Sequence, residues 1–167
     1  GVQYGELAAR QIDASIEYYA DLFKRTHHVD WNVVREKALL WESIIEDYDR
    51  DALQEIRGIA EGSGRLLGEI LALNARGEMI FSGFMKADEC TSFALTPKGN
   101  AAGKAFAGKN WDWRVGASPG RVILRVKQPG RTSMNIIGEA GKLGRDGINS
   151  AAIALFATGL PAHPGSP

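Results

Sequence analysis

The chain has 167 residues, 44% of them hydrophobic and 24% charged, a composition that suits one globular domain with its own core. Lys and Arg balance Asp and Glu at 20 each, so the net charge is zero, which argues against a nucleic-acid-binding protein. No apolar run is long enough to span a membrane and no signal peptide is visible, so we expect a cytoplasmic protein.

The N-terminal part of the chain carries the pattern of amphipathic helices. From Leu7 to Phe23, apolar side chains recur three to five positions apart, which places them on one helical face. The same spacing predicts a second helix over residues 31–47, with Asp30 as its N-cap.

Two further helices are expected before residue 78. Asp49 or Asp51 can cap the third, whose pattern is broken at residues 62–64 by Gly-Ser-Gly. The fourth spans residues 65–75 and ends near Gly77.

From residue 78 on, short apolar segments alternate with Gly, Pro and Asn, which is typical of strands and turns. The first of these segments, residues 79–85, is compatible with either a helix or a strand. The expected strands are residues 92–95, 105–112, 121–127, 132–138 and 151–157. Helices followed by strands predict an α+β fold in which helices cover an antiparallel sheet.

Two motif-like patterns do not predict a ligand. Glycines recur every third residue from Gly138 to Gly147, but no strand and long helix flank them, so we interpret them as turns. Three alternating aspartates begin at Asp47 as in a calcium loop, yet Ala52 and Gly58 stand where that loop needs Gly and Glu. We therefore predict no metal and no organic cofactor.

Cys90 is the one cysteine of the chain, so it cannot form an internal disulfide and its reactivity is what matters. A free cysteine is more often a small buried apolar residue than a nucleophile, and Cys90 alone favours that interpretation. However, Thr91 and Ser92 follow it and a strand-like run begins there, as expected for a nucleophile at the start of a strand. A redox sensor would need a resolving cysteine, which the chain lacks.

Short motifs through most of the chain, taken in order, point to one family. They are Tyr4-Gly5, residues 55–62 (EIRGIAEG), 69–76 (EILALNAR), 89–93 (ECTSF), 110–113 (NWDW), 139–141 (EAG) and 147–151 (GINSA). Together they resemble the acyl-coenzyme A:6-aminopenicillanic acid acyltransferase family, also called the isopenicillin N acyltransferase or peptidase C45 family of N-terminal nucleophile hydrolases.

The resemblance implies a fold of αββα layers, of which this chain would be a single partial domain over residues 1–167. Residues 1–89 would be a mostly helical α chain or pro-segment, and residues 90–167 the start of a mostly stranded β chain. The precursor, a zymogen, would cut itself between Glu89 and Cys90 by autoproteolysis. The cysteine thiol would attack the preceding carbonyl, and water would resolve the thioester.

The new α-amine of Cys90 then suits a general base, because its reference pKa of about 7.7–8.0 leaves it partly neutral at physiological pH. The resemblance implies that the thiolate forms an acyl-enzyme with a small N-acyl amide, such as an acylated β-lactam nucleus or amino acid. Water would complete hydrolysis, and an amine would complete acyl transfer.

The resemblance also suggests roles for neighbouring residues. Asp112 would orient the Cys90 amine or hold a substrate ammonium, and the alternative is a hydrogen-bonded aspartate at a strand end. Thr91 and Asn110 would support the reaction. Trp111 and Trp113 would line the acyl pocket, although a core position is the usual place for such aromatic residues.

The chain departs from the family pattern in three ways. Glu89 stands where the best-known members have glycine, which tolerates the strained backbone of self-cleavage. Lys142 and Asp146 replace apolar residues, and we expect them to pair with each other or to face solvent. The chain is also about half of a family precursor, whose C-terminal part supplies further sheet layers and the oxyanion amide. Glu139 and Asn149 are expected to satisfy the backbone of turns, and the alternative for Asn149-Ser150 is an approach to the site.

The opposing interpretation is a truncated or uncleaved homologue that acts as an interaction or folding module. For the enzyme, the expected partners are a small-molecule amide or acyl-coenzyme A thioester and the protein's own cleaved chain or missing C-terminal part. A homo-oligomer remains open, and neither nucleic acid nor a membrane is expected as a partner.

Overall fold

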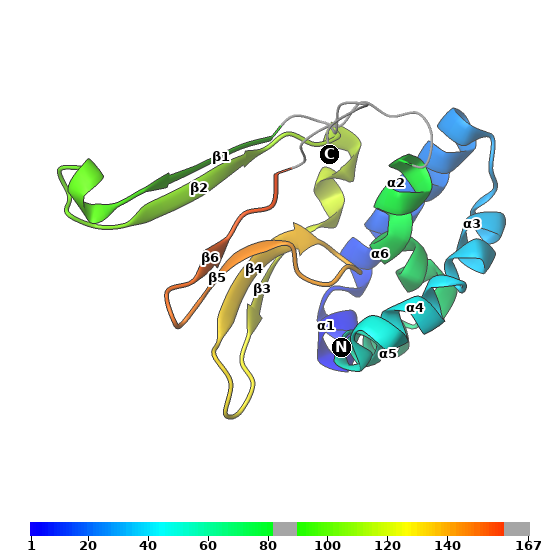
Figure 1. The fold of residues 1–167 in the computed structure, drawn as a ribbon. Helices are drawn as coiled ribbons and strands as arrows, with labels where there is room; N and C mark the ends of the chain where they lie inside the picture. Colours follow the sequence, from blue (N-terminus) through cyan, green and yellow to red (C-terminus); the bar gives the residue numbers. More distant parts are fainter. Residues whose placement is uncertain (82–89, 159–167) are drawn as a thin grey trace.

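The computed structural model describes residues 1–81 and 90–158, and in it helices precede strands (Figure 1). The helices are α1 (Val2–Leu7), α2 (Ala9–His27), α3 (Trp31–Ala38), α4 (Trp41–Tyr48), α5 (Arg50–Ser63) and α6 (Leu67–Phe81). The strands are β1 (Cys90–Leu95), β2 (Phe106–Trp111), β3 (Arg121–Val126), β4 (Met134–Glu139), β5 (Asp146–Asn149) and β6 (Ala154–Leu155). Two short 3₁₀ helices, η1 (Pro97–Gly99) and η2 (Val115–Gly120), lie between strands. The α+β prediction is confirmed.

The main core lies among the helices, where apolar faces meet because their side chains repeat at helical spacing. Its largest fully buried apolar side chains are Tyr19, Ile12, Leu53, Ile56, Ile59, Ile70, Leu71 and Leu73. The predicted caps are present: the Asp30 carboxylate accepts the Asn32 N–H, and the Asp49 carboxylate accepts the N–H groups of Asp51 and Ala52. Among the described residues, no helix has the length and apolar character that a membrane span requires.

The helix predicted over residues 31–47 is in fact two helices. The chain turns at Leu39 and Leu40, whose N–H groups bond three residues back, to Glu36 and Lys37. Both leucines are exposed. The tight turn that they form separates α3, which buries Val34, from α4, which has no buried residue. The periodicity predicted the helical conformation of both segments but not the turn between them.

Glycines let α1 and α5 pack backbone against backbone. A Cβ atom at Gly58 would lie 2.9 Å from the Gly1 Cα and the Val2 nitrogen. A Cβ at Gly5 would lie 2.5 Å from the Ile59 carbonyl oxygen. Any larger residue at either position would push the two helices apart.

The strands form two antiparallel sheets, β1–β2 and β3–β4–β5–β6. One face of the larger sheet lies towards the helices, and Val122 packs against the helical core. The other face exposes Ile123 and Ile137, which are paired across β3 and β4. Strand β5 was not predicted, because its Gly147 was interpreted as part of a turn. The strand predicted over residues 151–157 is reduced to β6.

The β1–β2 hairpin projects away from the helices, and its tip with η1 is the part farthest from them (Figure 1). The opposite end, where Cys90 begins β1 and Trp111 ends β2, lies next to the body of the molecule. The hairpin therefore presents its predicted site residues at the junction between the two sheets and the helices. Helix α6 includes the start of the apolar run at residues 79–85, and the rest of that run lies outside the described residues.

Candidate active site

Cys90 is the first residue of β1 and is partly buried. It pairs directly with Trp111 of β2, so the thiol-bearing residue faces an aromatic residue across the two strands. Glu89 lies outside the described residues, and with it the bond predicted to be cut. The nucleophile predicted from the sequence is thus placed at a strand end, with one of the two predicted pocket tryptophans as its direct neighbour.

The other predicted site residues are not all gathered around the thiol. Thr91 pairs with Asn110, and because neighbouring residues of a strand point to opposite faces, this exposed pair lies on the face away from Cys90. Asp112 follows the last residue of β2 and is exposed, and no hydrogen bond or ion pair joins it to another described residue. Its role at the Cys90 amine remains a proposal.

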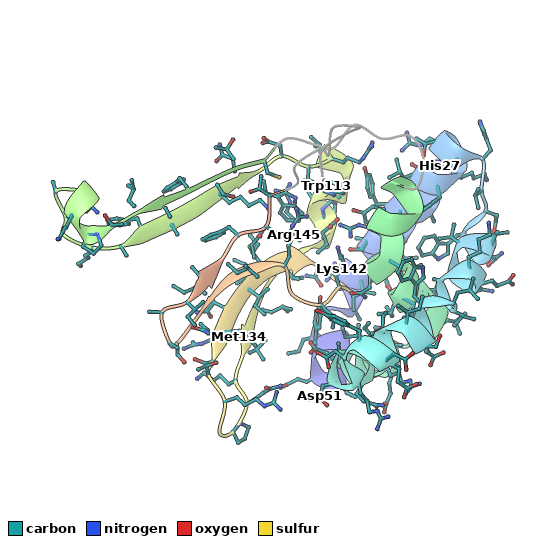
Figure 2. The ribbon with its side chains drawn as sticks, viewed as in Figure 1. His27, Asp51, Trp113, Met134, Lys142 and Arg145 are labelled. Carbon is teal, nitrogen blue, oxygen red and sulfur yellow. The ribbon has the colours of Figure 1, made fainter. Side chains whose placement is uncertain are left out.

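Trp111, the last residue of β2, and Trp113, labelled in Figure 2, form an aromatic wall beside the strand ends. Their rings stack with centroids 6.5 Å apart. The guanidinium carbon of Arg145 lies 4.5 Å from the centroid of the Trp111 ring, and that of Arg121 lies 5.4 Å away. Such cation–π contacts hold the ring that faces Cys90 in one orientation.

A buried polar network that the sequence did not reveal supports this wall. The Trp113 indole N–H donates to the Tyr19 hydroxyl over 3.0 Å, and that hydroxyl donates to the Glu139 carboxylate over 2.5 Å. Arg76 of α6 completes the network with an ion pair to Glu139, and both side chains are almost fully buried. Burial chiefly raises the pKa of Tyr19 far above its usual value, with Glu139 adding to the effect and Arg76 opposing it.

Glu139 is therefore a core ion-pair partner, and the prediction that it satisfies turn backbone is wrong. Its partner Arg76 lies 63 positions away, so no local pattern could have revealed the pair. The prediction for Asn149 is confirmed, because its side-chain oxygen accepts the N–H groups of Ala151 and Ile153.

Asp146 also departs from its prediction, since it neither pairs with Lys142 nor faces solvent. Its carboxylate lies 3.1 Å from the Lys109 ammonium, and each of these side chains is 3% exposed. Arg145 adds a weaker contact, with its Nε 3.6 Å from the same carboxylate. Lys109 belongs to β2 and Asp146 to β5, so this buried pair joins the two sheets close to Cys90.

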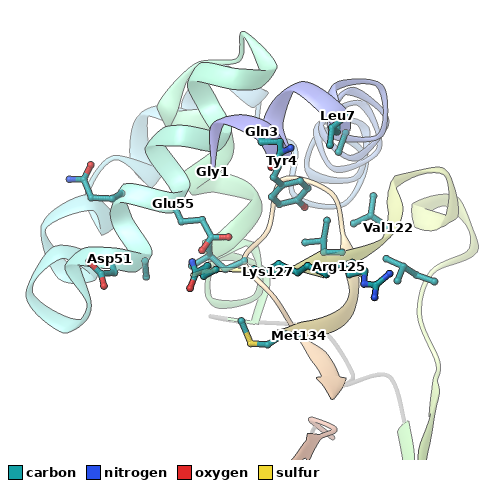
Figure 3. A pocket seen from close by; sticks show the side chains of 18 of the residues that line it. Gly1, Gln3, Tyr4, Leu7, Asp51, Glu55, Val122, Arg125, Lys127 and Met134 are labelled. Carbon is teal, nitrogen blue, oxygen red and sulfur yellow. The ribbon is translucent and has the colours of Figure 1, made fainter. Parts of the chain in front are cut away.

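Two hollows accompany these elements. A groove of about 1250 Å³ lies between β3 on one side and helices α1 and α5 on the other, and Tyr4, Glu55 and Lys127 line it (Figure 3). None of the predicted site residues is among its described lining residues. A smaller, apolar hollow of about 300 Å³ lies between β2 and the exposed face of the larger sheet. Its lining includes Ala107, Ile123, Ile137, Asp146, Ile148 and Phe156.

The smaller hollow lies on the same face of β2 as the Cys90 site, and none of the predicted site residues is among its described lining residues. Ala107, Lys109 and Trp111 alternate along β2 and so share one face, the face on which Cys90 lies in β1. Lys109 contacts Asp146, which also lines the hollow. No group of three or more His, Cys, Asp or Glu side chains in the described parts of the chain is arranged to hold a metal ion.

Comparison with known proteins shows that the chain is similar in sequence to an enzyme. It is 31% identical, over 178 aligned positions, to the acyl-coenzyme A:6-aminopenicillanic-acid-acyltransferase 40 kDa form of Emericella nidulans. The chain is a relative of this acyltransferase. The match covers 98% of the chain, so the family resemblance inferred from the motifs is confirmed. No protein-family model matches the chain.

The chain spans about half the length of the acyltransferase, since the match covers 47% of that protein. The helices, the Cys90 strand and the larger sheet of this chain thus correspond to one part of a longer relative. What the whole relative does can be carried to this chain only as a proposal.

Proposed function

We propose that this protein is a self-processing cysteine acyltransferase or amidohydrolase of the N-terminal nucleophile type, with the αββα layers of that class. The observation that carries the proposal is the place of Cys90: a partly buried free thiol at the first position of β1, opposite Trp111. The relationship to an acyltransferase supports an enzymatic function.

In the proposed processing step, the Cys90 thiol attacks the Glu89 carbonyl carbon and the peptide nitrogen leaves as the α-amine of Cys90. Water then hydrolyses the thioester, which frees the Glu89 carboxylate and regenerates the thiol. The thiol and its base now sit on one residue, so proximity is built in. Asp112, one residue beyond the partner of Cys90, would orient the new amine.

In the proposed turnover, the amine takes the thiol proton and the thiolate attacks the carbonyl carbon of a small N-acyl amide. The leaving amine departs with a proton, and the acyl group stays on Cys90 as a thioester until water or a second amine accepts it. The apolar hollow beside β2 suits a small apolar acyl group, because its volume is at the lower end for ligand pockets. An acyl-coenzyme A thioester would acylate the same thiol.

Trapping of the acyl-enzyme tests this proposal. The protein is incubated with a small acyl thioester, quenched in acid, and the peptide that begins at Cys90 is weighed. We expect one acyl group on that peptide in the wild type, and acylation slowed about 10²-fold in Asp112→Asn, because a misplaced base is typically that costly. A cleaved wild-type protein whose Cys90 takes no acyl group from the thioester would contradict the enzyme proposal.

A second candidate, a non-catalytic interaction module, is favoured by a different observation. Phe93, Leu95 and Phe106 of the hairpin are each about half exposed, and an exposed apolar strip is typical of a surface that binds another chain. The two candidates differ in Cys90, which the module does not need. An uncut chain with an inert thiol would favour the module.

A further inference from the structure

The strand pair that carries Cys90 is fixed to the rest of the molecule by side chains rather than by shared sheet hydrogen bonds. Strands β1 and β2 pair only with each other, and a two-stranded sheet on its own is marginally stable in water. Within residues 1–81 and 90–158, the hydrogen bonds that join this pair to other parts of the chain come from Lys109 and Ser92.

Lys109 makes the deeper of these connections. Its ammonium donates to the Asp146 carboxylate and to the Ala157 carbonyl oxygen. The other oxygen of Asp146 accepts the Ala157 N–H over 2.7 Å, so the three residues close a ring of polar contacts. Both charged side chains are 3% exposed, and a buried charge is tolerated only when it is paired and hydrogen-bonded in this way.

Ser92 lies directly opposite Lys109 and two positions from Cys90. Its hydroxyl is 2.5 Å from the hydroxyl of Thr158, next to Ala157. Each strand of the pair is therefore bonded to the same short segment of chain, Lys109 to the Ala157 carbonyl oxygen and Ser92 to the Thr158 hydroxyl. Because Cys90, Ser92 and Lys109 share one face, these bonds determine how the thiol sits against the larger sheet.

Asp146 is also connected, through Arg145, to the tryptophan that pairs with Cys90. Arg145 contacts its carboxylate and lies over the ring of Trp111, the residue that pairs with Cys90. A change in the Lys109–Asp146 pair would therefore disturb both the strand of the nucleophile and the aromatic wall opposite it.

We propose that Lys109 and Asp146 are positioning residues of the Cys90 site, whose buried ion pair docks the β1–β2 strands on β5 and on Ala157. The inference rests on the proposed function for its catalytic consequence, but the docking itself does not depend on any reaction. A misplacement of about 1 Å at a reacting group can slow a reaction about 10²-fold, which is the effect that loss of docking would have.

Hydrogen exchange of backbone amides tests the docking directly, in the whole protein. In Lys109→Met we expect exchange in residues 90–95 and 106–111 to accelerate about a hundredfold, because removal of one partner leaves a buried charge. Amides of α2 and α5 should keep their wild-type protection. Arg57→Met is the matched control, since it breaks an ion pair between α5 and α4 and should leave the exchange of β1 and β2 unchanged.

Ser92→Ala gives a second test that does not threaten folding, because Ser92 is exposed. We expect the same two strands to exchange faster, by a smaller factor of about three to ten, as one neutral hydrogen bond is lost. Unchanged exchange of β1 and β2 in Lys109→Met, or an acceleration shared equally by α2 and α5, would overturn the proposal.

The catalytic consequence has its own measurement. The rate of cleavage before Cys90, taken at a temperature where every variant is folded, should fall about 10²-fold in Lys109→Met and stay unchanged in Arg57→Met. Lys109→Arg should recover most of the rate, because a guanidinium can reach the same carboxylate. An uncut wild type would contradict the proposed function, whereas the exchange pattern alone decides whether the ion pair docks the strands.

Discussion

The helical half and the stranded half of the chain keep their shape by different means. In the helices, apolar side chains such as Leu53, Ile56 and Leu71 have no exposed surface. In the strands, Ile123 is 77% exposed and Leu155 is 65% exposed. The helices are thus stabilised by burial of apolar area, which is the dominant favourable term in folding.

The strands depend instead on a few buried polar contacts. Arg76 and Glu139 join α6 to β4, and Lys109 and Asp146 join β2 to β5. Such ion pairs are directional, so they fix the position of one element against another, whereas apolar contact alone would let the two elements slide. The comparison suggests that the candidate site, which lies among the strands, depends more on single polar residues than the helical core does.

The largest expected effect is at the ion pair between the two halves. Arg76→Met should lower the free energy of unfolding by about 3–5 kcal/mol, because Glu139 would stay buried without its cation. Arg57→Met, which breaks a pair whose side chains are about a third exposed, should cost only about 0–1 kcal/mol. Urea unfolding of both variants measures the difference, and equal small losses would show that the buried pair does not hold the halves together.

Matched isoleucines compare the two halves themselves. Ile56→Ala should cost about 2–5 kcal/mol, since it opens a cavity in the helical core. Ile123→Ala removes the same atoms from an exposed strand position and should change stability by no more than about 0.5 kcal/mol. Similar losses in urea unfolding would mean that the exposed sheet face is covered in solution.

Alkaline pH should weaken the contacts between helices and strands through two phenols, that of the partly buried Tyr4 and that of the buried Tyr19. Burial chiefly raises the pKa of Tyr4 to about 12, and it raises that of Tyr19 still further. Unfolded tyrosine has a pKa of about 10, so this stabilisation is fully present below pH 10 and is lost as the pH rises through the folded values.

Melting temperatures recorded between about pH 9 and pH 12 should therefore fall steeply in the wild type. The fall should be shallower in Tyr19→Phe, which has one fewer phenol to ionise. A parallel fall in both proteins would contradict the assignment of the effect to Tyr19.

The smallest expected effect is a helix cap that touches no strand. Asp49→Ala removes the acceptor of two N–H groups at the start of α5 and should cost about 1 kcal/mol. Asp49→Asn, which keeps a side-chain acceptor, should cost less. Urea midpoints report both values, and a larger loss for the asparagine variant would show that the charge matters more than the hydrogen bonds.

Local features of the fold could be predicted from the sequence because their causes are local. Asp30 and Asp49 act within three residues of themselves, and the helical periodicity needs only neighbouring turns. Strand β5 was not predicted because its cause is not local. Its pairing with β4 stabilises it, whereas its own residues, Asp146 to Asn149, favour a turn.

The candidate site could be predicted only in part. The motif around Cys90 located the strand that holds the thiol, and the structure pairs it with Trp111 as a neighbour. The Lys109–Asp146 and Arg76–Glu139 pairs join residues 37 and 63 positions apart, and charge alone does not identify such partners in a sequence. Contacts that depend on tertiary packing needed the structure.

The most direct test of the account is the intact mass of the purified protein under denaturing conditions, beside that of Cys90→Ala. The account predicts two fragments, residues 1–89 and 90–167, in the wild type, and one uncut chain in Cys90→Ala. Arg57→Met serves as the control and should still be cut, because it breaks an ion pair between α4 and α5 and leaves β1 and β2 unchanged. A single uncut chain in the wild type, or the same two fragments from Cys90→Ala, would contradict the claim that Cys90 is a self-processing nucleophile.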